Sequence, residues 1–138
     1  MDASKVDFGK QYLNRLNILR QAYRRFGTNE ELDRFCEENS DWLPDFALFM
    51  ALKEKFNGDP WYKWEKGLKF RQATALKAAR KELADEIRFY SFVQYLFFKQ
   101  WNDLRNYAHN NGVKIIGDVP IYVPYDSVEV WSEPKLFQ

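Results

Sequence analysis

The sequence predicts a mainly α-helical chain that ends in one β-strand. The region up to Asn111-Gly112 consists of long segments with helical apolar periodicity, separated by glycine, asparagine and proline signals. The helix-stop pair Asn111-Gly112 then gives way to Val113–Ile116, a short run in which β-branched residues dominate. We therefore divide the chain into a helical region, residues 1–111, and a strand-and-loop region, residues 112–138.

The first predicted helix spans Asp7 to Phe26. Its apolar residues recur at helical spacing, and Gly27 supplies a stop signal at the C-terminus. This pattern is typical of an amphipathic helix at the surface of a helical layer. The apolar stripe consists of Phe8, Tyr12, Leu16, Leu19 and Tyr23.

Two further helices are predicted to follow. Thr28 or Asn29 can cap a helix that runs through Glu38, within which Cys36 is expected to be a small buried apolar residue. No basic group at helical spacing favours its thiolate. Ser40 is expected to head a third helix, which is apolar on more than one face and therefore predicted to lie between layers.

The segment from Trp61 to Phe70 interleaves aromatic residues with lysines. The simpler interpretation is that Trp61 and Trp64 pin a loop onto the helical layer. A sugar-stacking role for these rings stays open. A nucleic-acid role is rejected, because 21 basic and 20 acidic side chains nearly cancel.

One long helix is predicted from Ala73 to Asn110, with Thr74 as its cap and His109 as a capping or surface residue. Its first half is rich in strong helix formers. Its second half is expected to be buried around most of its circumference. The residues that carry this expectation are Phe89, Tyr90, Phe92, Val93, Leu96, Phe97, Trp101, Leu104 and Tyr107.

The composition excludes several classes of site and location. With a single cysteine and a single histidine, the chain has no intramolecular disulfide, and no metal site or Cys-His pair of its own. No apolar run approaches the roughly 20 residues of a membrane span. The first residues do not read as a signal peptide. We therefore expect a cytoplasmic protein without a membrane partner.

The last stretch, GDVPIYVPYDSVEVWSEPKLF, closely resembles a segment of the amylomaltase-type 4-α-glucanotransferases that reads roughly GDLPIYVA-DSADVWANPELF. The upstream runs DWLPDFALFMALKEKFNGDPWYKW and FVQYLFFKQWNDLRNYAHNNGVKIIGD are also similar to that family. The resemblance thus covers nearly the whole chain. Because a complete family member is several times longer, it implies that this chain is an internal fragment of an enzyme.

The resemblance implies a TIM (β/α)8 barrel as the parent fold, with inserted subdomains. Residues 1–111 would form a helical insertion whose long helix leads into the barrel. Residues 112–138 would form the third barrel strand and the start of an active-site loop. The implied activity is retaining, double-displacement transfer of α-1,4-glucan segments between maltooligosaccharides, starch or glycogen chains, without a cofactor or metal.

The resemblance also assigns substrate-binding residues. Asp118 matches the carboxylate that helps to shape the donor sugar site, and Pro120 and Tyr122 match its adjoining wall. Asp126 and Trp131 match a run that continues into a loop beside the acceptor groove. None of the family's catalytic motifs occurs here, so no catalytic residue is assigned and the fragment alone is expected to be inactive.

Other interpretations stay open at this point. Asp118 could instead cap a turn. Asp118 and Asp126 are rejected as a catalytic pair, because a retaining pair normally comes from different strand ends. The chain could also be an autonomous helical interaction module whose tail docks as an added strand, or a carbohydrate-binding module. An unpaired terminal strand would favour self-association of the isolated fragment.

Overall fold

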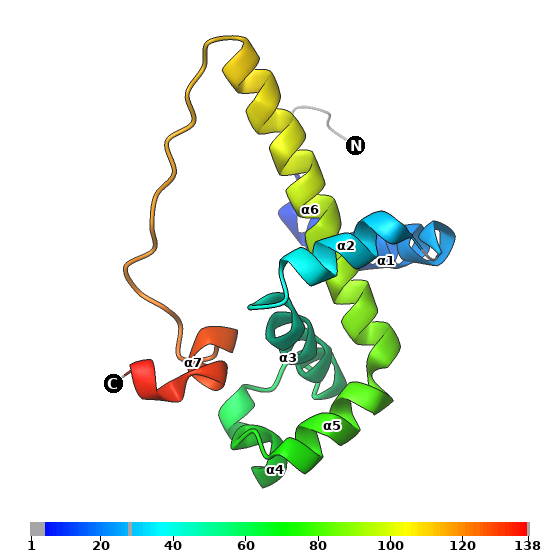
Figure 1. The fold of residues 1–138 in the computed structure, drawn as a ribbon, viewed down its shortest axis with the longest axis vertical. Coiled ribbons are helices and arrows are strands. Elements are labelled where there is room, and N and C mark those ends of the chain that lie inside the picture. Colours follow the sequence, from blue (N-terminus) through cyan, green and yellow to red (C-terminus); the bar gives the residue numbers. More distant parts are fainter. Residues whose placement is uncertain (1–4, 28, 138) are drawn as a thin grey trace.

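The computed structural model describes residues 5–27 and 29–137. Figure 1 shows a body of packed helices, from which a long helix and an extended arc project. The predicted helical majority is confirmed. The α-helices are α1 (Phe8–Phe26), α2 (Glu30–Glu38), α3 (Leu43–Lys55), α4 (Lys66–Lys69), α5 (Ala73–Glu82), α6 (Ala84–Asn110) and α7 (Val128–Ser132), and the 3-10 helices are η1 (Trp61–Lys63) and η2 (Pro134–Leu136).

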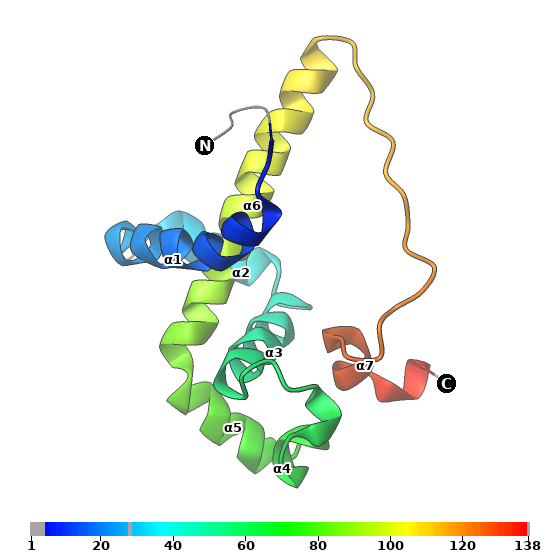
Figure 2. The ribbon, with the colours of Figure 1, turned by 180° about the vertical axis from the view of Figure 1, so that it is seen from behind.

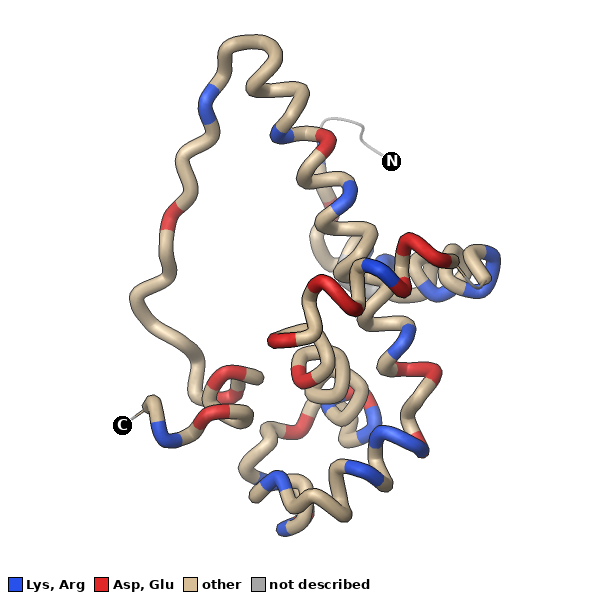
Figure 3. Tube along the Cα trace, viewed as in Figure 1, with Lys and Arg blue, Asp and Glu red and all other residues tan. Residues whose placement is uncertain are grey.

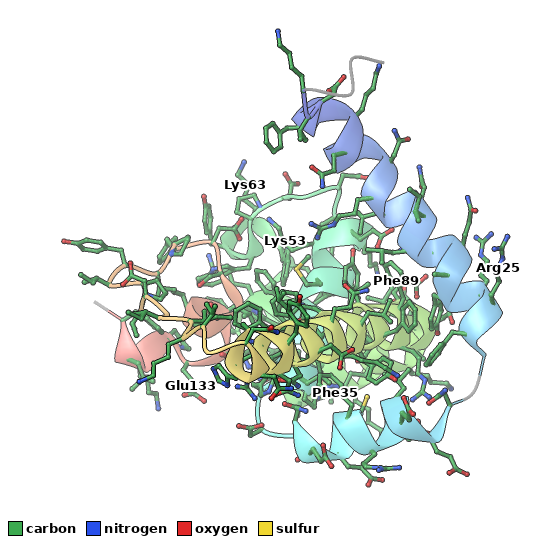
Figure 4. All side chains as sticks on the ribbon, turned by 90° about the horizontal axis from the view of Figure 1, so that it is seen from above. Arg25, Phe35, Lys53, Lys63, Phe89 and Glu133 are labelled. Carbon is green, nitrogen blue, oxygen red and sulfur yellow. The ribbon has the colours of Figure 1, made fainter. Side chains whose placement is uncertain are left out.

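The core lies where α3 packs along α6. As its apolar circumference predicts, α3 lies between layers. It buries Leu43, Ala47, Leu48, Phe49, Ala51 and Leu52. In Figure 4, α1 and α2 lie on either side of α6, with Phe89 labelled at their crossing region. The rings of Phe89 and Phe92 are almost fully buried there and contact Tyr23 of α1.

The first two helices each begin at a capping side chain, of which Asn29 is the predicted one. The Asp7 carboxylate accepts a hydrogen bond from the Lys10 N–H, and Asn29 Oδ1 accepts one from the Glu31 N–H. Thr28, the alternative cap, lies outside the described residues. So does the side chain of Tyr12. Of the remaining stripe of α1, Leu19 and Tyr23 reach the core, whereas Phe8 and Leu16 are exposed.

The third helix begins later than predicted, at Leu43 and not near Ser40. A turn occupies the intervening residues. Asn39 holds this turn by donating from Nδ2 to the Phe35 carbonyl and by accepting a 3.0 Å hydrogen bond at Oδ1 from Trp42 Nε1. These hydrogen bonds of the Asn39 side chain compete with helix formation and delay the start of α3.

The prediction of one continuous helix from Ala73 to Asn110 is wrong. Leu83 leaves the helical conformation, with φ −101° and ψ 26°, and separates α5 from α6. Figures 1 and 2 show the two helices meeting at an angle. No Pro or Gly marks the break. The bend lets Leu76 and Ala79 of α5 join the same core as Phe89 of α6, so tertiary packing overrides helix propensity.

The predicted strand at Val113–Ile116 is not seen in the structure. No strand occurs within residues 5–27 and 29–137, and the segment from Val113 to Tyr125 runs as an exposed arc between α6 and α7 (Figures 1 and 2). A strand needs a neighbour for its backbone N–H and C=O groups. The helices of this chain offer none, so an apolar, β-branched run stays unpaired.

The second half of α6 is buried only in part. Phe89, Phe92 and Tyr95 are buried, but Phe97, Leu104 and Tyr107 are 56 to 69% exposed. The expected burial of α6 around most of its circumference therefore stops near Phe98, and α6 is mostly exposed beyond it. Leu104 and Tyr107, beyond Phe98, and the apolar residues of the arc are exposed among the described residues.

Candidate functional site

The predicted substrate-binding residues fall into two groups. Asp118, Pro120 and Tyr122 lie in the arc, where Tyr122 is 89% exposed. The Asp118 side chain makes no hydrogen bond within the described residues, so a turn-capping contact is not seen. Figure 3 shows little charge along the arc, and its sequence from Val113 to Tyr125 contains Lys114 and Asp118 as the charged residues.

Asp126 is held at the edge of the helical body. Its Oδ2 atom lies 2.7 Å from Lys53 Nζ on α3, and its Oδ1 atom accepts a 3.1 Å hydrogen bond from the Trp61 backbone N–H. Lys53 also donates to the carbonyls of Gly58 and Asp59, at 2.6 and 3.1 Å. We call Lys53, Asp126 and the Trp61 N–H the clasp. It leaves the Asp126 carboxylate occupied by protein partners.

Tyr125 strengthens the same junction. The indole N–H of Trp61 donates to the Tyr125 carbonyl at 2.8 Å, and the Tyr125 ring lies 5.4 Å from the Trp61 ring and 5.3 Å from the Tyr62 ring. The clasp and these ring contacts fix the end of the arc. Its start is fixed by the end of α6, where Val113 N–H donates to the Ala108 carbonyl.

Trp131 has a structural place in the core. Its side chain is 1% exposed, and its Nε1 donates a 3.0 Å hydrogen bond to the Leu68 carbonyl. The Arg71 guanidinium lies 4.4 Å from the centre of the indole ring. A sugar cannot reach a ring enclosed in this way. The structure therefore disagrees with a direct substrate contact for Trp131 in this chain.

The aromatic segment after α3 also supports the core. Trp61 and Trp64 are 7 and 4% exposed, and Trp64 Nε1 donates to the Asp59 carbonyl. The prediction that the two rings pin a loop onto the helical layer is thus confirmed. Cys36 is half-buried against the core, and burial raises the pKa of its thiol, which disfavours a reactive thiolate.

Two tyrosines hydrogen-bond to carboxylates beside the core. Burial, and then the hydrogen bond to Asp85, raises the pKa of Tyr23 to about 12. Burial and the hydrogen bond to Glu54 also raise the pKa of Tyr90 above its usual value. Glu54 is itself paired with Arg20. These hydrogen bonds and the ion pair connect α1 and α3 to α6. We therefore interpret them as structural contacts.

Lys53 is the residue at this junction that sequence reasoning did not single out. Its position near the polar end of α3 gave it the appearance of a solvated helix residue. Its partner Asp126 lies 73 residues away, and no local pattern signals a pair at that separation. Figure 4 labels Lys53, which lies over the packed helices and not on their outer edge.

Two further properties of the described residues bear on the class of site. Within residues 5–27 and 29–137, no His, Cys, Asp and Glu side chains gather in a group of three or more that could hold a metal ion. Every helix in those ranges is too short or too polar to cross a membrane.

Comparison with known proteins extends over the same residues. A family model described as 4-alpha-glucanotransferase matches residues 1–138. The chain is 40% identical over 134 residues to the 4-alpha-glucanotransferase of Clostridium butyricum, and 42% identical over 139 residues to that of Thermus thermophilus. The amylomaltase from Streptococcus agalactiae in complex with acarbose is similar in structure, with a TM-score of 0.88 at 40% identity.

The coverage of these matches is unequal. Each of the three comparisons covers 96% of this chain but 28% of the other protein. The chain therefore spans less than a third of the length of the relatives that it matches.

Proposed function

Because the chain belongs to the 4-alpha-glucanotransferase family, we propose that it forms part of an enzyme that transfers α-1,4-glucan segments between maltooligosaccharides. The observation that carries this proposal is the match of the family model over the whole chain, joined to the structural likeness to an amylomaltase. Acarbose, present in that related structure, resembles a maltooligosaccharide, which supports the substrate class.

The proposed reaction is a retaining double displacement. One carboxylate attacks the sugar and forms a glycosyl-enzyme, and a second carboxyl group acts first as acid and then as base. Neither role is assigned within this chain. Asp118 is proposed to shape the donor sugar site, with Pro120 and Tyr122 as its wall. Their exposure in the arc supports this, because they are free to face further polypeptide and substrate.

The proposed architecture divides the chain at residue 111. Residues 1–111 form the helical insertion and the helix that leads into a TIM barrel, and residues 112–138 supply its third strand and the following loop. The uncovered face of α6 and the unpaired Val113–Ile116 run support this assignment, since neighbouring barrel strands would supply the missing partners. We also propose a cytoplasmic location, with which a free cysteine is compatible.

Two matched assays test the proposal. The longer polypeptide that contains this segment is expected to disproportionate maltotriose, releasing glucose and longer maltooligosaccharides. The 138-residue chain alone is expected to release none. A longer polypeptide that is folded but inactive on every α-1,4-glucan would contradict the proposed activity. Glucose release by the short chain would instead show that its own carboxylates suffice.

A further inference from the structure

A pocket of about 380 Å³ lies between α2 and α6, far along the chain from the arc. Figure 4 labels Phe35, which lies at the junction of these two helices. The volume falls within the range of small-molecule sites. We call this the α2–α6 pocket. Its lining residues from α2 and the following turn are Glu31, Arg34, Phe35, Glu38 and Asn39, and those from α6 are Tyr95, Phe98, Lys99 and Asn102.

One wall of the pocket is aromatic. The ring of Phe35 lies 5.7 Å from that of Phe98 and 5.9 Å from that of Tyr95. Phe35 and Phe98 are half-buried, so part of each ring faces the pocket, whereas Tyr95 is 7% exposed. Flat apolar rings of this kind can pack against the C–H face of a pyranose ring.

Part of the polar lining of the pocket, namely Glu31, Asn39, Tyr95 and Lys99, is held in place by partners within the chain. The Tyr95 hydroxyl donates to the Glu31 carboxylate, and Lys99 Nζ lies 3.0 Å from Glu31 Oε2 and 3.2 Å from the Tyr95 hydroxyl oxygen. Asn39 is fixed by Trp42 and by the Phe35 carbonyl. A ligand would therefore meet donors and acceptors that lose little conformational freedom on binding.

The charges of the lining residues balance. Glu31 and Glu38 are matched by Arg34 and Lys99, and the Asn102 amide adds both a donor and an acceptor. A pocket with balanced charge gives no preference for a free anion or cation. Closely spaced donors and acceptors suit hydroxyl groups, each of which can both donate and accept.

A second groove on the same body provides a contrast. It has a volume of about 540 Å³ and is also rich in aromatic residues, including Trp42 and Phe97. Its charged lining residues are all acidic, and Asp45 is already paired with Arg71 and Arg80. No Lys or Arg lines it. It therefore lacks the cationic donors of the α2–α6 pocket and serves as an internal control.

We propose that the α2–α6 pocket binds a glucosyl unit of an α-glucan, separately from the sugar-site segment around Asp118. The choice of glucan as ligand rests on the proposed function, whereas the polyhydroxyl class rests on the pocket itself. A second attachment point on one polypeptide would raise the effective concentration of a long glucan at the transfer site.

The test is a titration of the ¹⁵N-labelled 138-residue chain with maltotriose, followed by the side-chain amide signals of Asn39 and Asn102. Both signals are expected to shift in a saturable way. The exposed rim variants Asn102→Ala and Arg34→Ala are expected to bind about two- to tenfold more weakly, since each removes a hydrogen bond to the ligand. Glu133→Gln, in the control groove, is expected to bind as the parent chain does.

Several results would overturn the proposal. These are the absence of saturable shifts at millimolar maltotriose, binding that Glu133→Gln weakens and Asn102→Ala does not, and equal shifts with the ring-free polyol sorbitol. Competition by inorganic phosphate would instead identify an anion site. Circular dichroism checks that each variant keeps its helices. Since this assay needs no catalysis, its failure leaves the maltotriose assay of the longer polypeptide unaffected.

Discussion

Lys53 Nζ lies 2.7 Å from Asp126 Oδ2, and this ion pair joins α3 to the end of the exposed arc. The side chains of Lys53 and Asp126 are 20 and 33% exposed, so the pair is better shielded from water than an ordinary surface ion pair. The same ammonium also binds two carbonyls of the turn after α3. One side chain thus holds a turn and a distant segment together.

Replacement of Lys53 by Met should destabilise the chain by about 1–3 kcal/mol, because three acceptors lose a charged donor and the bond to Asp126 is partly buried. Urea unfolding followed by Trp fluorescence measures this change. Lys55→Met is the matched control. Its partner Glu82 is 58% exposed, so removing that pair should change stability by less than about 1 kcal/mol. Equal losses in the two variants would refute the clasp.

Trp131→Ala should lower the free energy of unfolding by about 3–5 kcal/mol, because it empties a buried site and removes the hydrogen bond to Leu68. Tyr122→Ala, at an 89% exposed position, should change it by less than about 0.5 kcal/mol. Thermal melts of the two variants separate a core role from a surface role. A Trp131→Ala protein as stable as the parent chain would contradict the core role of Trp131.

Gly67→Ala should destabilise the chain by about 1–3 kcal/mol through overpacking. A Cβ atom at Gly67 would lie 2.9 Å from the Cβ of Ala75, where α4 meets α5. Gly117→Ala is the control, because a Cβ there meets nothing within 4 Å. Chemical denaturation of both variants tests the close approach. An unchanged midpoint for Gly67→Ala would mean that α4 and α5 can move apart freely.

These contacts show what could be predicted from the sequence. The apolar stripe that ends at Gly27 and the cap at Asn29 act over short stretches, so local pattern was enough to place the first two helices. The bend at Leu83 has no local breaker and depends on where the core lies. A strand at Val113–Ile116 would need partners that the described residues do not include, so its apolar pattern alone could not make it pair.

The candidate site divides in the same way. The family resemblance assigned a substrate-binding role to both Asp118 and Trp131, because both residues lie in the same matched run. Burial separates the two, since Trp131 faces the core. That difference arises from contacts with Leu68 and Arg71, more than 55 residues earlier in the chain. Only the folded arrangement could reveal it.

Stability should fall as the pH rises from about 10 toward 12. The pKa of Tyr23 is raised from 10.0 to about 12 in the folded chain, first by burial and then by its hydrogen bond to Asp85. In this interval the unfolded chain loses the phenol proton while the folded chain keeps it, so unfolding becomes more favourable. The stabilising contribution is complete below pH 10.

Tyr23→Phe should weaken this alkaline dependence, because it removes one of the groups that titrate differently in the two states. Urea midpoints at a series of alkaline pH values provide the measurement, and Tyr122→Phe is a control at an exposed position. If both variants keep the full slope of the parent chain, Tyr23 is not among the groups responsible for it.

The isolated chain should self-associate through Val113–Ile116. This run is exposed and apolar apart from Lys114, its backbone lies outside any sheet, and Ile116 is 93% exposed. Sedimentation velocity at increasing concentration should show a rising average mass. Ile116→Lys should reduce this association, because a charge opposes edge-to-edge pairing.

A second lysine substitution, on α1, distinguishes strand pairing from nonspecific association through exposed apolar side chains. Ile18→Lys on α1 removes a similarly exposed apolar side chain, 64% exposed, from a helix whose backbone is already paired. If association comes from any exposed apolar surface, both substitutions should reduce it equally. If it comes from unpaired backbone, Ile116→Lys should act more strongly. Ile121 is a weaker choice, because Pro120 and Pro124 flank it and already limit ladder formation.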